Sequence, residues 1–194
     1  MNLPNKLTLL RVLLIPFFLL FMYIKVPCHY GIALVIFAAA SITDALDGKI
    51  ARAKNLVTNF GKFLDPLADK VLVIAALAVF VDLPMVRMGA VPLIIITARE
   101  FMVSGLRLLA ANSGVVVAAG IWGKLKTAFT MLAIIAILFW LFLFYDLGIG
   151  FPYEFMRAVE FILVPVLVWI STILTVISGA VYLKGYWHLI DSDK

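Results

Sequence analysis

Residues 127–145 read TAFTMLAIIAILFWLFLFY, an apolar run without a charged side chain. About 20 mostly apolar residues in a helix suffice to cross the hydrocarbon core of a bilayer. A second uncharged run, residues 161–183, reads FILVPVLVWISTILTVISGAVYL. Long uninterrupted runs of this kind are typical of membrane-spanning helices, so these two stretches decide the fold class.

Four more apolar windows precede these two runs, and the connections between the windows are short. The predicted spans are residues 7–26, 30–53, 61–82, 88–111, 122–145 and 157–183. The sequence therefore predicts an all-α integral membrane bundle of six transmembrane helices. Because no connection is long enough for a soluble domain, we expect residues 1–194 to form one membrane domain.

The composition of the whole chain supports this fold class. Of its 194 residues, 65% are hydrophobic and only 14% are charged, and the mean hydropathy is +1.14. Soluble domains are about half apolar and about a quarter charged, so the composition argues against a soluble enzyme and against a disordered chain. Cys28 is the single cysteine, so an intrachain disulfide cannot form.

Lysine and arginine are distributed unevenly between the two sides of the predicted bundle. Most of them fall near the N-terminus, the connections after the second and fourth spans, and the C-terminus. Cytoplasmic segments of membrane proteins carry such an excess, so we expect both termini to be cytoplasmic. The same effect explains the net charge of +5 better than a nucleic-acid partner does. We therefore predict a protein of a bacterial-type cytoplasmic membrane that binds no nucleic acid.

Residues 44–70 read DALDGKIARAKNLVTNFGKFLDPLADK and hold the densest set of charged side chains. Asp44 and Asp47 are three positions apart, and Asp65 and Asp69 are four apart, so each pair shares one helix face. If the two helices are antiparallel neighbours, the four carboxylates converge near the cytoplasmic edge. They repel one another unless some are protonated or cations hold them. Mg²⁺ and Mn²⁺ prefer such oxygen ligands, and paired ions recur in phosphoryl transfer.

Two other interpretations of these carboxylates stay open. They could be solvated charges at helix ends, or they could line an ion or proton pathway. Solvated charges seldom repeat on one face of two successive segments. The basic residues at the same edge favour a site for anionic substrate groups.

The same stretch carries a sequence signature. Its eight fixed residues follow the pattern D-x2-D-G-x2-A-R-x8-G-x3-D-x3-D over 26 positions, from Asp44 to Asp69. This pattern resembles the signature of the CDP-alcohol phosphotransferases. Residues 2–17, 97–110 and 123–128 resemble the branch of that family whose acceptor is glycerol 3-phosphate. The similarity covers nearly the whole chain and is weakest over residues 140–194.

The resemblance implies roles for most residues of the signature. In the family, the four aspartates bind two divalent cations, Mg²⁺ or Mn²⁺, and one aspartate also acts as a base. Carried over to this sequence, the metal ligands are Asp44, Asp47, Asp65 and Asp69, and Asp69 is the general base. The implied CDP-binding residues are Asn5, Thr8, Gly48, Ala51, Arg52 and Thr58.

The second substrate needs a phosphate site of its own, and basic residues of the fourth and fifth spans are the candidates. Glu100, Ser104 and Arg107 form one polar stripe at positions i, i+4 and i+7 of a helix. The predicted acceptor-phosphate residues are Arg99, Arg107, Lys124 and Lys126. Two alternatives stay open: the basic residues anchor helices at lipid headgroups, or Arg99 and Glu100 hold helices together.

The resemblance implies a membrane enzyme that transfers the phosphatidyl group of CDP-diacylglycerol to glycerol 3-phosphate. Asp69 would accept the proton of the attacking hydroxyl, and phosphatidylglycerophosphate and CMP would be the products. Family members are homodimers, so we expect a homodimer embedded in membrane lipid. The competing hypotheses are the same chemistry with another acceptor (inositol phosphate, serine or phosphatidylglycerol) and a small carboxylate-based cation transporter.

Overall fold

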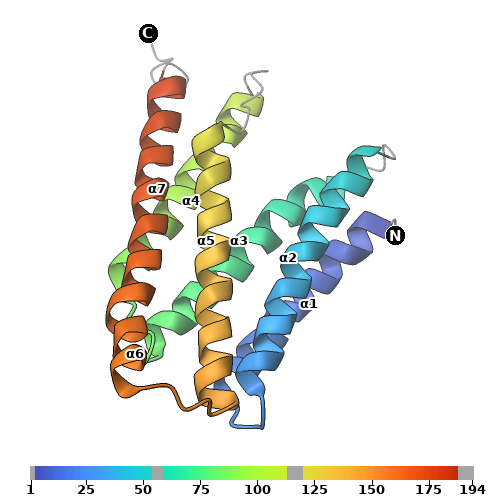
Figure 1. Ribbon diagram of the computed structural model, residues 1–194. Helices are drawn as coiled ribbons and strands as arrows, with labels where there is room; N and C mark the ends of the chain where they lie inside the picture. The colour runs from blue at the N-terminus through green and yellow to red at the C-terminus, as the bar shows by residue number, and fades with distance from the viewer. Residues whose placement is uncertain (1–2, 54–58, 113–119, 188–194) are drawn as a thin grey trace. The chain divides into compact units, whose positions relative to one another are not determined.

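The structure is a computed structural model of the chain (Figure 1). It describes residues 3–53, 59–112 and 120–187, with the side chains of residues 3–4, 44–63, 65–66 and 111–112 left out. The described residues form helices joined by short connections, and no strand occurs among them.

Seven α-helices and two π-helical segments make up the described chain. The α-helices are α1 (Leu3–Tyr23), α2 (His29–Ala53), α3 (Asn59–Asp82), α4 (Ala90–Asn112), α5 (Ile121–Leu141), α6 (Tyr153–Ala158) and α7 (Val164–Tyr186). The π-helical segment η1 (Phe142–Asp146) continues α5, and η2 (Val159–Leu163) joins α6 to α7. The described residues thus form six long helical segments, and each begins and ends within four residues of a predicted span. The predicted all-α membrane fold is confirmed.

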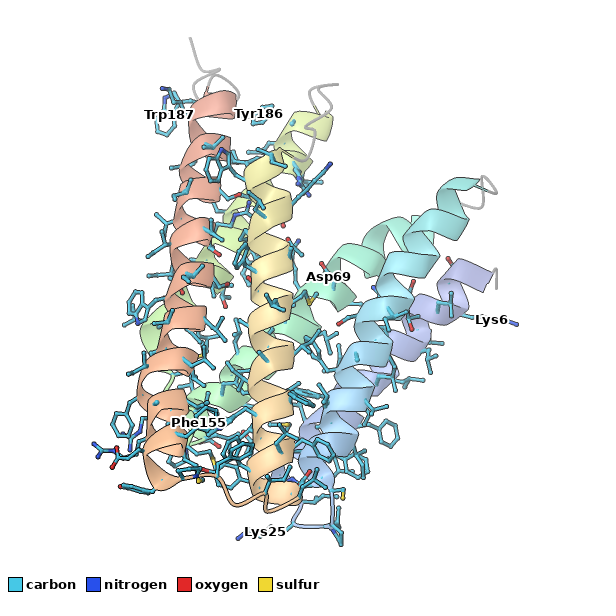
Figure 2. The ribbon with its side chains drawn as sticks, in the orientation of Figure 1. Lys6, Lys25, Asp69, Phe155, Tyr186 and Trp187 are labelled. Carbon is cyan, nitrogen blue, oxygen red and sulfur yellow. The ribbon has the colours of Figure 1, made fainter. Side chains whose placement is uncertain are left out.

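Three of these segments are long and apolar enough to cross a membrane by length and composition. They are Asn5–Tyr23, Ile121–Asp146 and Tyr153–Tyr186, and the described part of α2 adds a shorter apolar helix, His29–Thr43. The last segment has 34 residues. At 1.5 Å per residue it is about 51 Å long, so it exceeds the ~30 Å hydrocarbon core. Phe155 and Tyr186 mark its two ends (Figure 2).

The helices separate into two compact units. Unit 1 comprises residues 1–82 and 134–153, and unit 2 comprises residues 83–133 and 154–194. Helix α5 contributes its first part to unit 2 and its second part to unit 1. That residues 1–194 act as one domain stays a prediction.

Unit 1 is built around α1. This helix packs along α2 and also against α3, and its N-terminal end lies at the same end of the unit as the last turns of α2 (Figure 1). The core between α1 and α2 contains the fully buried rings of Phe18 and Phe37, whose centroids are 5.8 Å apart. Burial of two such rings stabilises the pair of helices through the hydrophobic effect.

Asp146, the last residue of η1, lies at the start of α2, and its side chain is only 2% exposed. Its Oδ2 accepts a hydrogen bond from the backbone N–H of Gly31 at 2.7 Å, and its Oδ1 lies 3.9 Å from His29 Nε2. His29 Nδ1 in turn lies 3.0 Å from the carbonyl oxygen of Phe21. A Cβ atom at Gly31 would lie 2.6 Å from the ring of Phe142, so only glycine lets η1 approach α2 this closely. These contacts tie α1, α2 and η1 together.

Unit 2 is built on the packing of α4 against α7. The buried face of α7 is rich in hydroxyl side chains, which are Ser171, Thr172, Thr175 and Ser178. Thr172 and Thr175 donate to carbonyl oxygens one turn earlier in their own helix, and Ser171 shares a hydrogen bond of 2.5 Å with Thr130 of α5. Because buried polar groups are costly unless hydrogen-bonded, these bonds allow a polar face to be buried.

Candidate active site

A buried polar stripe runs along the N-terminal half of α1. Asn5, Thr8 and Arg11 follow one another at intervals of three positions, and all three are buried. Because α1 packs against α2 and α3, this stripe belongs to the three-helix packing that includes the signature helices. Asn5 and Thr8 were predicted as CDP-binding residues. Arg11 was not predicted as a site residue, and its spacing from Thr8 is the signal that could have placed it in the stripe.

The first half of the signature lies in the last turns of α2. The backbone is helical throughout residues 44–53, which places positions 44, 47 and 51 on one helix face. The side chains of Asp44, Asp47, Gly48, Ala51 and Arg52 lie outside the described part of the structure, and Thr58 lies wholly outside it. Helix α3 then begins at Asn59 and carries the second half of the signature.

Asp69 is the signature aspartate whose side chain the structure describes. It lies on α3 (Figure 2), half-buried, between the buried residues Ala68 and Leu72. The side chain of Asp65 lies outside the described part. Among the described side chains, no group of three or more His, Cys, Asp or Glu residues could hold a metal ion. The sequence nevertheless offers a donor set of carboxylates at helical spacing on two successive helices, and this donor chemistry fits hard divalent cations.

Two of the predicted acceptor-phosphate residues, Arg99 and Lys126, contact Glu100. Glu100 Oε1 accepts hydrogen bonds from Lys126 Nζ at 2.5 Å and from Arg99 Nη1 at 3.0 Å. Arg99 Nη2 also donates to Ser178 Oγ at 2.6 Å. Arg99 and Lys126 are 9% and 6% exposed, so two buried cations share the carboxylate of Glu100. This Glu100 cluster links α4, α5 and α7.

The other two predicted phosphate-binding residues are exposed. Arg107 lies two turns after Arg99 on α4, and its Nη2 donates to the hydroxyl of Tyr182 at 2.9 Å. Lys124 lies in the first turn of α5. Arg99 and Lys126 share the one carboxylate of Glu100, and Arg107 adds a positive charge two turns along α4, so positive charge is in excess and suits an anionic ligand. The four predicted acceptor-phosphate residues therefore divide into two buried cations paired with Glu100 and two exposed cations.

Two residues of this cluster were not predicted from the sequence, Ser178 and Tyr182. They lie four positions apart and therefore on one face of α7. That spacing of two polar side chains is the signal that could have identified them.

Comparison with known proteins places the chain in a family. The sequence profile of the CDP-alcohol phosphatidyltransferases matches residues 1–177. The chain belongs to the CDP-alcohol phosphatidyltransferase family. This confirms the resemblance drawn from the signature and makes the chain a phosphatidyltransferase. Enzymes of this family generally depend on divalent cations.

Several relatives of this phosphatidyltransferase carry one name, CDP-diacylglycerol–glycerol-3-phosphate 3-phosphatidyltransferase. The relative from Bacillus subtilis strain 168 is 40% identical over 205 residues, which cover 100% of this chain and 99% of that protein. The relative from Rickettsia typhi strain Wilmington is 38% identical over 184 residues, covering 95% and 96%. The relative from Escherichia coli K12 is 43% identical over 135 residues, covering 69% and 74%.

Proposed function

We propose that this phosphatidyltransferase transfers the phosphatidyl group of CDP-diacylglycerol to glycerol 3-phosphate, giving phosphatidylglycerophosphate and CMP. The observation that carries the proposal is the 40% identity over the full chain to a relative named for this reaction. The reaction is a step of phospholipid biosynthesis, and it suits a chain whose helices are apolar enough to lie in the bilayer.

The proposed metal site is formed by Asp44, Asp47, Asp65 and Asp69, which would hold two divalent cations, Mg²⁺ or Mn²⁺. It is supported by the helical spacing of the four positions and by the cation dependence of the family. Two bound cations would offset the negative charge of the diphosphate and of the departing CMP.

The proposed CDP site joins the buried stripe of α1 to the signature. Asn5 and Thr8 would contact the nucleotide with polar groups, and Thr58 is assigned to the same site. The small residues Gly48 and Ala51 leave room for a bulky ligand to approach the backbone of α2. An arginine at position 52, Arg52, suits the diphosphate because its planar fork of donors matches two phosphate oxygens at once.

The proposed acceptor-phosphate site comprises four of the cations of unit 2 in two different roles. Arg107 and Lys124 are exposed and would contact the phosphate of glycerol 3-phosphate directly. Arg99 and Lys126 are buried against Glu100. They would contribute positive electrostatic potential and help to keep the shape of the phosphate site. Of the five N–H donors of a guanidinium, the bond to Tyr182 occupies one on Arg107, so others remain for a ligand.

The proposed chemical step needs one proton acceptor. Asp69 would take the proton of the 1-hydroxyl of glycerol 3-phosphate. The hydroxyl oxygen would then form a bond to the phosphorus that bears the diacylglycerol, and the bond from that phosphorus to the CMP oxygen would break. A positioned carboxylate contributes about 10²–10⁴ in rate as a general base.

Three further features of the proposal concern the whole chain. Residues 1–194 would act as one catalytic domain, which is supported by a family profile that extends through both units. Both termini and the active site would face the cytoplasm, as the distribution of lysine and arginine indicates. The enzyme would be a homodimer embedded in membrane lipid.

An acceptor assay tests the proposed function. Purified protein in detergent receives CDP-diacylglycerol, Mg²⁺ or Mn²⁺, and one alcohol at a time, and CMP release is measured. We expect release that depends on glycerol 3-phosphate. Release only with inositol phosphate, serine or phosphatidylglycerol would assign another acceptor. Absence of CMP with every alcohol, together with cation transport in vesicles, would contradict the proposed class of reaction.

A further inference from the structure

Tyr182 of α7 occupies a central place in the basic region of unit 2. Its side chain is 4% exposed, and its hydroxyl oxygen accepts hydrogen bonds from Arg107 Nη2 at 2.9 Å and from the backbone N–H of Gly120 at 3.3 Å. Gly120 immediately precedes α5, whose first turn carries Lys124. One buried hydroxyl therefore joins the two elements that carry the exposed cations.

The ring of Tyr182 has a second set of contacts. The guanidinium carbons of Arg99 and Arg107 lie 5.4 Å and 5.5 Å from its centroid, within the ~6 Å range of cation–π attraction. A Cβ atom at Gly123 of α5 would lie 3.6 Å from the same ring, an ordinary packing distance. The ring therefore lies between the two arginines of α4 and the first turn of α5.

Two residues close to Tyr182 on α7, Ser178 and Gly179, also lie against Arg99. Ser178, one turn earlier, accepts the hydrogen bond of Arg99 at 2.6 Å. A Cβ atom at Gly179 would lie 3.1 Å from Cγ of Arg99 and 3.3 Å from Cε of Met102, so a larger residue would displace the arginine stem. Ser178, Gly179 and Tyr182 therefore form one face of α7 that lies against the arginines of α4. This face lies beyond residue 177, where the match to the family profile ends.

We propose that Tyr182 is a positioning residue for the acceptor phosphate, and this inference rests on the proposed function. Its hydroxyl holds the Arg107 side chain and the start of α5 in one arrangement before the substrate binds. A long arginine side chain loses rotamer freedom when it binds a ligand, and a side chain that is already held loses less. The phosphate of glycerol 3-phosphate therefore binds more tightly than it would to the same cations without Tyr182.

The test removes only the hydroxyl. Tyr182→Phe keeps the ring and its packing, and we expect the KM for glycerol 3-phosphate to rise about tenfold, as for loss of a hydrogen bond to a charged group. Inhibition by inorganic phosphate should weaken by the same factor. The KM for CDP-diacylglycerol and kcat should stay within about twofold, because an interaction equal in ground and transition states affects KM alone.

Tyr186→Phe is the matched control. Tyr186 lies one turn further along α7, its ring centroid is 6.2 Å from that of Tyr182, and the substitution again removes a single phenolic hydroxyl (Figure 2). We expect it to leave the glycerol 3-phosphate KM unchanged. A double-mutant cycle adds a readout that a merely structural residue would not move. In an Arg107→Ala background, Tyr182→Phe should raise that KM by less than about twofold, because its main partner is already absent.

The outcomes separate this inference from the proposed function. Wild-type CMP release with glycerol 3-phosphate decides the proposed function first. If the wild type is active and Tyr182→Phe has an unchanged KM and phosphate inhibition, the inference alone is overturned. It is equally overturned if Tyr182→Phe fails to fold, or if the effects of Tyr182→Phe and Arg107→Ala simply add.

Discussion

The two units differ in what balances the charge of their charged residues. In unit 2, Glu100 lies within hydrogen-bond distance of both Lys126 and Arg99, so the protein itself supplies the counter-charge. In unit 1, the proposed partners of the signature aspartates are metal ions, which are not part of the chain. The role of a charged residue that is paired within the chain can be assigned from its contacts. The role of a charged residue whose partner is a ligand has to be inferred from the sequence pattern and tested with that ligand.

Unit 1 also contains an acid that is paired internally. Asp146 accepts a hydrogen bond from the backbone of Gly31 and lies near His29, at the start of α2. This site has one carboxylate and one histidine, whereas the Glu100 cluster and its neighbours have cations in excess. We infer that Asp146 stabilises the fold of unit 1 and that the excess cations of unit 2 serve a ligand.

Removal of divalent cations should have the largest effect. We expect excess EDTA to reduce CMP release by more than ~10²-fold, because metal ions contribute several kcal/mol to transition-state charge stabilisation. Added Mg²⁺ or Mn²⁺ should restore the activity. Undiminished turnover in EDTA would show that the aspartates of unit 1 need no external counter-charge, and the contrast between the units would disappear.

Substitution of single aspartates should separate binding from chemistry in unit 1. We expect Asp69→Asn to lose about 10²–10⁴ in turnover while Mn²⁺ and CDP binding, measured by calorimetry, stay close to normal. Asp44→Asn is the comparison variant, and it should lose both metal binding and turnover. Normal turnover in Asp69→Asn would place the base elsewhere. If Asp69→Asn loses metal as fully as Asp44→Asn, Asp69 acts chiefly as a ligand.

Substitution of Asp146 should have the smallest effect on catalysis. Asp146→Ala leaves the N–H of Gly31 without its carboxylate partner, which should lower the free energy of unfolding by about 1–3 kcal/mol. Thermal unfolding in detergent measures this loss, and Asp146→Asn, which keeps an acceptor oxygen, should lose less. Both KM values of the folded enzyme should be unchanged. A raised KM for glycerol 3-phosphate would show that the excess cations of unit 2 are not the feature that governs acceptor binding.

The fold could be predicted from the sequence because its cause is local. Runs such as residues 127–145 are apolar enough to be helices in a membrane whatever their neighbours are, and the helical segments begin and end close to the predicted windows. The two π-helical segments, η1 and η2, were not predicted, since nothing in their composition distinguishes them from the α-helices they continue.

The candidate site could be predicted only in part. The signature predicts its aspartates as site residues because a fixed spacing over 26 positions is specific, and this stays a prediction where the side chains lie outside the described structure. Arg99, Arg107, Lys124 and Lys126 were predicted as one group, whereas the structure divides them into buried and exposed pairs. That division depends on Glu100, Ser178 and Tyr182, which are brought together by the packing of helices distant in sequence.

The transfer of labelled acceptor into lipid tests the central claim most directly. Purified wild-type protein would be incubated with unlabelled CDP-diacylglycerol, a divalent cation and glycerol 3-phosphate that carries radioactive phosphorus. We predict that label enters the chloroform-soluble lipid in equal molar amount to the CMP released, and that EDTA abolishes both. Release of CMP without label in the lipid would show hydrolysis instead of transfer to glycerol 3-phosphate, and it would contradict the account.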